Sequence, residues 1–152
     1  MIQRIQTIYL IISAAICAVL FSHPFASFNI NNPDSIITAT VCHTIPNAGL
    51  NAKLVPLAAI STSLLLLTVI AIFMFRNRTK QMLVTRINIV LCIAQLALMI
   101  GSFSALKSSL NSDFNGLDLW LAAPVIMIVL QYLAYRGIKK DDDLVKSADR
   151  LR

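Results

Sequence analysis

The residues best suited to bind a metal are His23, Cys42 and His43, which share one stretch between two apolar segments. Neutral imidazole and thiolate are ligands for zinc and copper ions. Their spacing matches no zinc signature, however. The chain has three cysteines, Cys17, Cys42 and Cys92, and no two of them form a CxxC pair. We therefore expect incidental loop residues, no disulfide framework, no metal site and no cofactor.

Groups for catalysis are scattered as well. Catalysis normally needs a positioned acid, base, nucleophile or metal. The chain has no Glu, and no Asp or His lies in the middle of an apolar segment. We therefore predict that the protein is not an enzyme.

A third candidate for chemistry is a polar seam within one apolar segment. Its members follow at alternating steps of three and four residues, which places them on one helix face: Thr85, Asn88, Cys92, Gln95, Met99 and Ser102. The seam either forms hydrogen bonds to neighbouring helices or lines a path for a solute or ion. Channels and pumps usually place ionisable groups at depth. Because none is found there, the sequence favours helix packing.

Composition indicates the kind of fold that must position these residues. The 152 residues are 57% hydrophobic and 13% charged, against about 45–50% and ~25% in soluble domains. Four apolar stretches are long enough for membrane-spanning helices of about 17–25 residues: residues 5–21, 54–75, 83–106 and 117–135. The sequence thus predicts an all-α integral membrane protein, an antiparallel four-helix transmembrane bundle over residues 1–138.

The basic residues predict how this bundle is oriented. Only Lys53 and Lys107 fall on one face of the predicted bundle, and all the other Lys and Arg residues fall on the opposite face. The positive-inside rule makes that face cytoplasmic, with both termini there. The determinants next to the spans are Arg76, Arg78, Lys80, Arg86, Arg136, Lys139 and Lys140. The net charge of +6 therefore reflects topology, and no nucleic-acid motif accompanies it.

Two features lie at the outer side of the predicted spans. The loop of residues 22–53 holds two runs rich in aromatic and β-branched residues around residues 31–34, which predicts a short β-hairpin. Pro124, near the outer end of the fourth span, lacks an N–H and crowds the carbonyl of Trp120. A kink or loosened first turns should follow.

The tail, residues 139–152, differs from the spans. Leu144, Ala148 and Leu151 form a narrow apolar stripe on a short helix, beside Val145 and Arg150. The run of Asp residues at 141–143 suits the start of that helix, and Asp142 and Lys146 form an i, i+4 pair. Such a helix is marginal alone, so the tail either docks on a surface or is solvated.

Several segments resemble a family of short bacterial membrane proteins that is classed only as a domain of unknown function. They are the opening MIQRIQT of residues 1–7, RTKQ of residues 78–81, RGIKKD of residues 136–141 and LVKSADRLR of residues 144–152, with Pro124. The resemblance implies a four-span protein of the inner membrane of Gram-negative bacteria. It implies no activity.

Two functions follow from these observations. The first is a non-enzymatic accessory protein that presents its cytoplasmic tail to a partner, with the lipid bilayer around it. The alternative is a small oligomeric transporter or channel that uses the polar seam. A homo-oligomer is compatible with either, since small residues such as Ser13 and Ala14 allow close helix approach.

Overall fold

The described part of the chain folds into four α-helices and a small sheet. The computed structural model describes residues 3–29, 36–41, 44–45, 54–110, 113–117 and 119–150. Within them the helices are α1 (Gln3–Leu20), α2 (Val55–Phe73), α3 (Arg78–Leu110) and α4 (Ala123–Arg150), with short 3₁₀ turns η2 (Met74–Arg76) and η3 (Leu119–Ala122).

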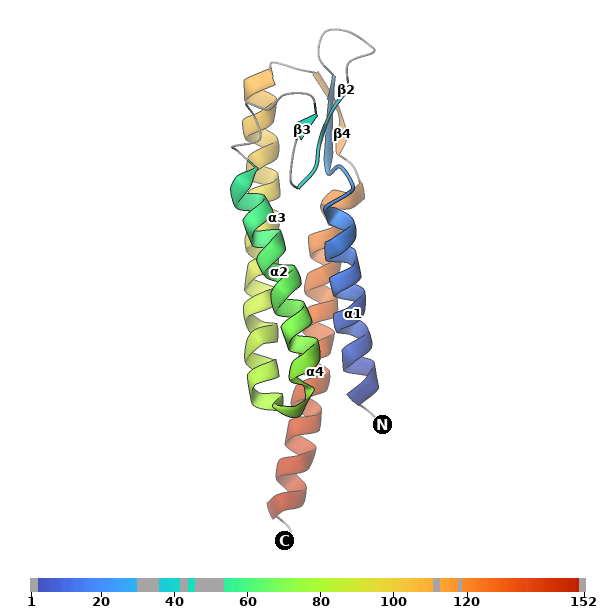
Figure 1. Ribbon diagram of the computed structural model, residues 1–152, viewed down its shortest axis with the longest axis vertical. Coiled ribbons are helices and arrows are strands. Elements are labelled where there is room, and N and C mark those ends of the chain that lie inside the picture. Colours follow the sequence, from blue (N-terminus) through green and yellow to red (C-terminus); the bar gives the residue numbers. More distant parts are fainter. Residues whose placement is uncertain are drawn as a thin grey trace.

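The helices alternate in direction and form a bundle (Figure 1). α1 contacts α2, α2 contacts α3, α3 contacts α4, and α4 closes the ring against α1. The sheet lies at one end of the bundle, which we call the sheet end. The start of α1, the η2 turn and the C-terminal part of α4 lie at the other, the termini end (Figure 1).

Among the residues that the structure describes, three helical segments are long and apolar enough to cross a membrane: Val55–Phe73, Arg78–Ala105 and Leu119–Ser147. α1 adds a shorter apolar segment, Ile5–Leu20. Large apolar side chains such as Ile12, Leu66, Ile93 and Val129 are exposed on the outside of the bundle. An apolar exterior of this extent is typical of a surface that faces lipid.

The interior, in contrast, contains polar as well as apolar side chains, and the buried positions follow a heptad pattern in all four helices. The buried positions follow at steps of three and four residues, as in knobs-into-holes packing. They are Gln6, Leu10, Ser13, Cys17 and Leu20 in α1; Leu57, Ser61, Leu64, Thr68 and Ala71 in α2; Gln81, Thr85, Asn88, Cys92, Gln95 and Met99 in α3; and Met127, Gln131, Ala134, Ile138 and Asp141 in α4.

The sheet has four antiparallel strands in the order β3-β2-β1-β4. β1 (Ala26–Asn29) pairs with β2 (Ile36–Ala39), and β2 pairs with β3 (Thr44–Ile45). The β1–β2 pair is the predicted hairpin. β4 (Asp113–Leu117) comes from the connection between α3 and α4, so a purely helical fold with one hairpin was an incomplete prediction.

Two predictions about the fourth helix have different outcomes. The α-helix begins at Ala123, with Pro124 in its first turn and the 3₁₀ turn η3 before it, which agrees with the expected loosened first turns. The second prediction, a boundary between residues 138 and 139, is not marked by any change of secondary structure, because α4 runs without a break to Arg150. The Asp run therefore lies in mid-helix and does not cap a separate tail helix.

Candidate functional site

The middle of the bundle holds one polar side chain from each helix: Ser13, Thr68, Asn88 and Gln131, which we call the polar layer. All four are fully buried. Asn88 Nδ2 donates to Thr68 Oγ1 at 3.1 Å, and Gln131 Nε2 lies 3.1 Å from Ser13 Oγ and 3.4 Å from Thr68 Oγ1. Thr68 itself donates to the Leu64 carbonyl at 2.7 Å. These contacts tie the four helices together at one level.

The polar layer is not fully paired. Within the described part of the chain, the side-chain oxygens of Asn88 and Gln131 have no hydrogen-bond partner, and neither has either polar atom of Gln95. Such atoms are costly in a protein interior. Apolar residues lie on both sides of the layer, with Leu10, Ala71 and Ala134 towards the termini end.

The polar seam predicted on α3 runs into this interior. Thr85, Cys92 and Met99 are fully buried, as are the two amides, whereas Ser102 is half-buried. Thr85 donates to the Gln81 carbonyl of its own helix at 2.8 Å. The structure thus brings Asn88 together with three other helices but leaves Gln95 and Ser102 outside that network.

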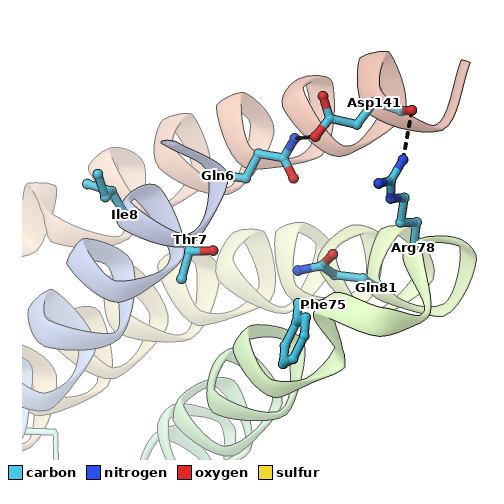
Figure 2. Close-up of a pocket in the computed structure, with 7 residues that line it drawn as sticks. All are labelled: Gln6, Thr7, Ile8, Phe75, Arg78, Gln81 and Asp141. Carbon is cyan, nitrogen blue, oxygen red and sulfur yellow. Dashed lines mark hydrogen bonds between the residues drawn. The ribbon is translucent and has the colours of Figure 1, made fainter. Parts of the chain in front are cut away.

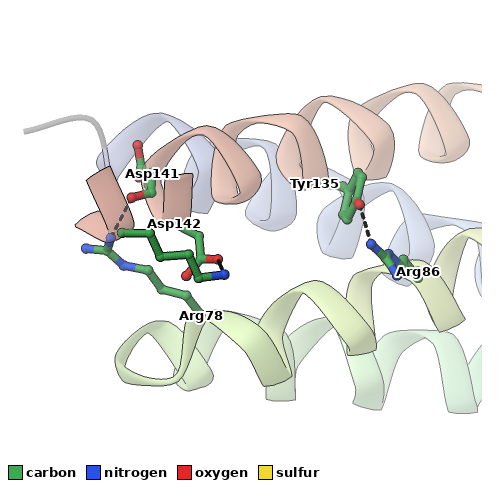
Figure 3. Close-up of polar contacts among 6 residues, drawn as sticks. Arg78, Arg86, Tyr135, Asp141 and Asp142 are labelled. Atoms are coloured by element: carbon green, nitrogen blue, oxygen red, sulfur yellow. Dashed lines mark hydrogen bonds and ion pairs between the residues drawn. The ribbon is translucent and has the colours of Figure 1, made fainter. Parts of the chain in front are cut away.

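A second polar cluster, which contains charged groups, lies at the termini end (Figures 2 and 3). Gln6 Nε2 donates to Asp141 Oδ2 at 2.6 Å, and Arg78 Nη1 donates to the Asp141 carbonyl at 2.9 Å. Asp141 is only 6% exposed. Among the described residues the one ion pair is Lys146 with Asp142, so the Asp141 carboxyl group meets an amide and no cation.

Gly137 makes this cluster possible. A Cβ at residue 137 would lie 2.7 Å from Cγ of Gln6, well inside van der Waals contact. The absence of a side chain lets α1 approach α4 closely enough for Gln6 to reach Asp141, which is 135 positions away in the sequence. The contact among Gln6, Gly137 and Asp141 was not predicted, because no local sequence pattern links the two ends of the chain.

A pocket of about 400 Å³ opens beside this cluster, and we call it the end pocket. Its walls come from all of the segments that meet at the termini end, as Figure 2 shows: Gln6, Thr7, Ile8, Phe75, Arg78, Gln81 and Asp141. Gln81 is held in place by a 2.9 Å hydrogen bond from its Nε2 to the Ala71 carbonyl. One wall therefore carries a guanidinium group, one a carboxyl group, and Phe75 and Ile8 add apolar surface.

Beyond Asp141, α4 continues past the rest of the bundle (Figure 1), and we call residues 142–150 the α4 extension. Leu144 and Val145 are about half exposed there. Lys146 Nζ donates to Asp142 Oδ2 at 2.5 Å, which confirms the predicted pair. The side chains of Ala148 and Arg150, and all of Leu151, lie outside the part that the structure describes.

The basic residues used to predict topology gather at the termini end. Lys80, Arg136, Lys139 and Lys140 are exposed, and the side chain of Arg76 lies outside the described residues. Arg86 Nη2 donates to the Tyr135 hydroxyl at 2.5 Å, with its guanidinium 4.9 Å from the centre of that ring (Figure 3). Aromatic and basic groups together are typical of a membrane–water boundary.

Of the three candidate metal ligands, His23 lies among the described residues. His23 stacks on Trp120 at the sheet end, with ring centroids 4.5 Å apart. Cys42 and His43 lie outside the described residues. Across the ranges that are described, no three His, Cys, Asp or Glu side chains gather in a way that would hold a metal ion.

No curated protein sequence matches this chain significantly. A family model does match, over residues 2–151, and its description is Domain of unknown function (DUF4293). The match includes every residue that lines the end pocket. Because it extends over nearly the whole sequence, the chain belongs to this family of unknown function.

Proposed function

We propose that this chain is a non-enzymatic accessory protein of a bilayer, the bacterial inner membrane by its resemblance, that presents the α4 extension to a protein partner in the cytoplasm. The observation that carries this proposal is the anchoring of Asp141 by Gln6 and Arg78. Residues 142–150 are fixed in direction by these bonds, since they continue a helix that is clamped to α1 and α3.

The surface of the α4 extension indicates what kind of partner it fits. Leu144 and Val145 expose apolar surface, and Lys139 and Lys140 precede them by about one turn. An apolar helix face next to basic residues suits a groove that is apolar inside and acidic at its rim. The partner we expect is therefore a protein with such a groove.

Site-specific photo-crosslinking in cells tests this proposal. A crosslinker at Leu144 or Val145 should capture one defined protein. The same group at Ile126, an exposed residue of the same helix near the sheet end, should not capture it. Replacing Lys139 and Lys140 by Gln should reduce the capture several-fold. If Ile126 captures the same species, or if a chain that ends at Asp141 still binds it, the proposal is wrong.

The four unpaired polar atoms of Asn88, Gln95 and Gln131 favour a second candidate, a small oligomeric transporter or channel. Water or a solute would satisfy these atoms. Against it stand the apolar residues Leu10, Ala71 and Ala134 on one side of the polar layer. A solute-flux assay of the Asn88→Leu, Gln95→Leu double variant decides, because full flux in that variant excludes the path.

A further inference from the structure

The end pocket lies where the apolar segments of α1, α2 and α3 end. The apolar part of α1 begins at Ile5, that of α2 ends at Phe73 and that of α3 begins at Arg78. The pocket residues Gln6, Phe75 and Arg78 are within two positions of these limits. In a bilayer this level corresponds to the headgroup region, which is about 5–8 Å deep on each side of the hydrocarbon core.

The charges in the pocket are opposite, and they do not neutralise each other. Arg78 uses Nη1 on the main-chain carbonyl of Asp141, and a guanidinium group carries five N–H donors in all. The Asp141 carboxyl group accepts from Gln6. Within the described ranges neither side chain belongs to an ion pair, so the cation and the anion each keep bonding capacity for a ligand.

The apolar part of the pocket lies on the outside of the bundle. Ile8 is 51% exposed and Phe75 is 64% exposed, and both line the pocket. In a membrane these two side chains face lipid, so a ligand reaches the pocket laterally from the bilayer. The volume of about 400 Å³ is within the range of about 300–1,000 Å³ for small-molecule sites.

From this arrangement we propose that the end pocket binds the headgroup of a zwitterionic phospholipid with a primary ammonium group, of the ethanolamine type. The phosphate lies against the Arg78 guanidinium, and the ammonium donates to the Asp141 carboxylate. The acyl chains contact Phe75 and Ile8. A primary ammonium fits better than a quaternary one, because Asp141 and Gln6 offer hydrogen-bond acceptors that a quaternary ammonium cannot use.

Native mass spectrometry of the purified full chain in detergent, titrated with single lipids, tests the proposal. Phosphatidylethanolamine should bind at least tenfold more tightly than phosphatidylglycerol, which lacks the ammonium, and than phosphatidylcholine, which lacks its N–H donors. Equal binding of either lipid would overturn the assignment. Glycerophosphoethanolamine, the soluble headgroup, should bind more than tenfold more weakly. If it binds as tightly as the lipid, the site takes a soluble ligand and the proposal is wrong.

Variants locate the binding. Asp141→Asn keeps an acceptor for Gln6 but removes the charge, and it should reduce the preference for phosphatidylethanolamine to less than threefold. Arg78→Gln should weaken the binding of phosphatidylethanolamine and of phosphatidylglycerol at least fivefold, because both carry the phosphate. Asp142→Asn, one residue further along and paired with Lys146 outside the pocket, is the matched control and should bind as the natural chain does. Equal losses in Asp142→Asn and Asp141→Asn would overturn the proposal.

A measurement of thermal unfolding without lipid accompanies each variant, so that loss of the fold is recognised. If Asp141→Asn does not fold, Gln6→Leu provides the second variant, since it removes the amide and leaves the charge of Asp141. The preference for ethanolamine should then persist, with weaker binding. A complete loss of preference in a folded Gln6→Leu chain would contradict the role given to Asp141. These lipid-binding results do not depend on whether a crosslinker at Leu144 captures a protein partner, so the two proposals can fail separately.

Discussion

The polar layer and the termini-end cluster use similar residues for different purposes. The polar layer has only neutral side chains, one from each helix, fully buried and linked mainly through Thr68. The cluster around Asp141 contains a carboxyl group and a guanidinium group, and it borders a pocket. A charge is expensive in the middle of a bilayer and far less expensive near its surface. The first group therefore fixes the register of the helices, whereas the second is placed to bind.

The sharpest way to test this comparison is to put a charge into the polar layer. Asn88→Asp should lower the free energy of unfolding by about 3 kcal/mol, the approximate cost of an Asp at the centre of a membrane helix. The same change at Asn77, which is exposed at the termini end, should alter it by less than about 0.5 kcal/mol. Denaturant unfolding in micelles measures both, and equal costs would remove the distinction between the two regions.

The next effect concerns the close approach at the termini end. Gly137→Ala introduces a Cβ that collides with Gln6, and overpacking of this kind should destabilise the chain by about 1–3 kcal/mol. Gly101→Ala is the control, since nothing lies within 4 Å of the added Cβ. It should stabilise α3 by about 0.5–1 kcal/mol. Opposite signs in thermal unfolding are the expected result, and a neutral Gly137→Ala would show that Gln6 can bind elsewhere.

A smaller effect is expected from removing the hydroxyl that links the polar layer. Thr68→Val keeps the shape of the side chain but leaves the donors of Asn88 and Gln131 with fewer acceptors. This should cost about 1–2 kcal/mol. Thr62→Val on the same helix removes an exposed hydroxyl that bonds only within α2, and it should change little. Similar losses of unfolding free energy in both variants would mean that the hydrogen bonds between helices in the polar layer do not stabilise the fold.

The last prediction leaves stability unchanged and compares a cysteine of the predicted outer loop with two cysteines buried in the bundle. Cys42, which lies between β2 and β3 in the sequence, should react with an impermeant thiol reagent added outside intact cells. Cys17 and Cys92 should not react, because both are fully buried. Mass spectrometry of the labelled chain gives the result. Labelling of Cys42 only after the membrane is opened would reverse the proposed orientation.

Local pattern accounts for what the sequence predicted. Spans follow from apolar length, and the burial of Asn88 and Gln95 follows from heptad spacing in α3. The same spacing is present from Gln6 to Leu20 and from Met127 to Asp141, so the sequence also holds the signal for Gln131. The contact of Gln6 with Asp141 could not be predicted, because it depends on how the first and last helices pack. β4 was missed because its sequence, DFNGL, has weak β-propensity.

The continuity of α4 has a mechanical consequence. Its 28 residues make a rod about 42 Å long, at 1.5 Å of rise for each residue. One end of the rod follows β4 and η3 at the sheet end, and the other projects beyond the opposite end of the bundle. A rod that pivots near its middle by about 5° displaces each tip by roughly 2 Å, in opposite directions. Because Gln6 and Arg78 hold Asp141 near the far end of the bundle, such a pivot is opposed there, and the rod keeps Leu144 at a constant distance from the sheet.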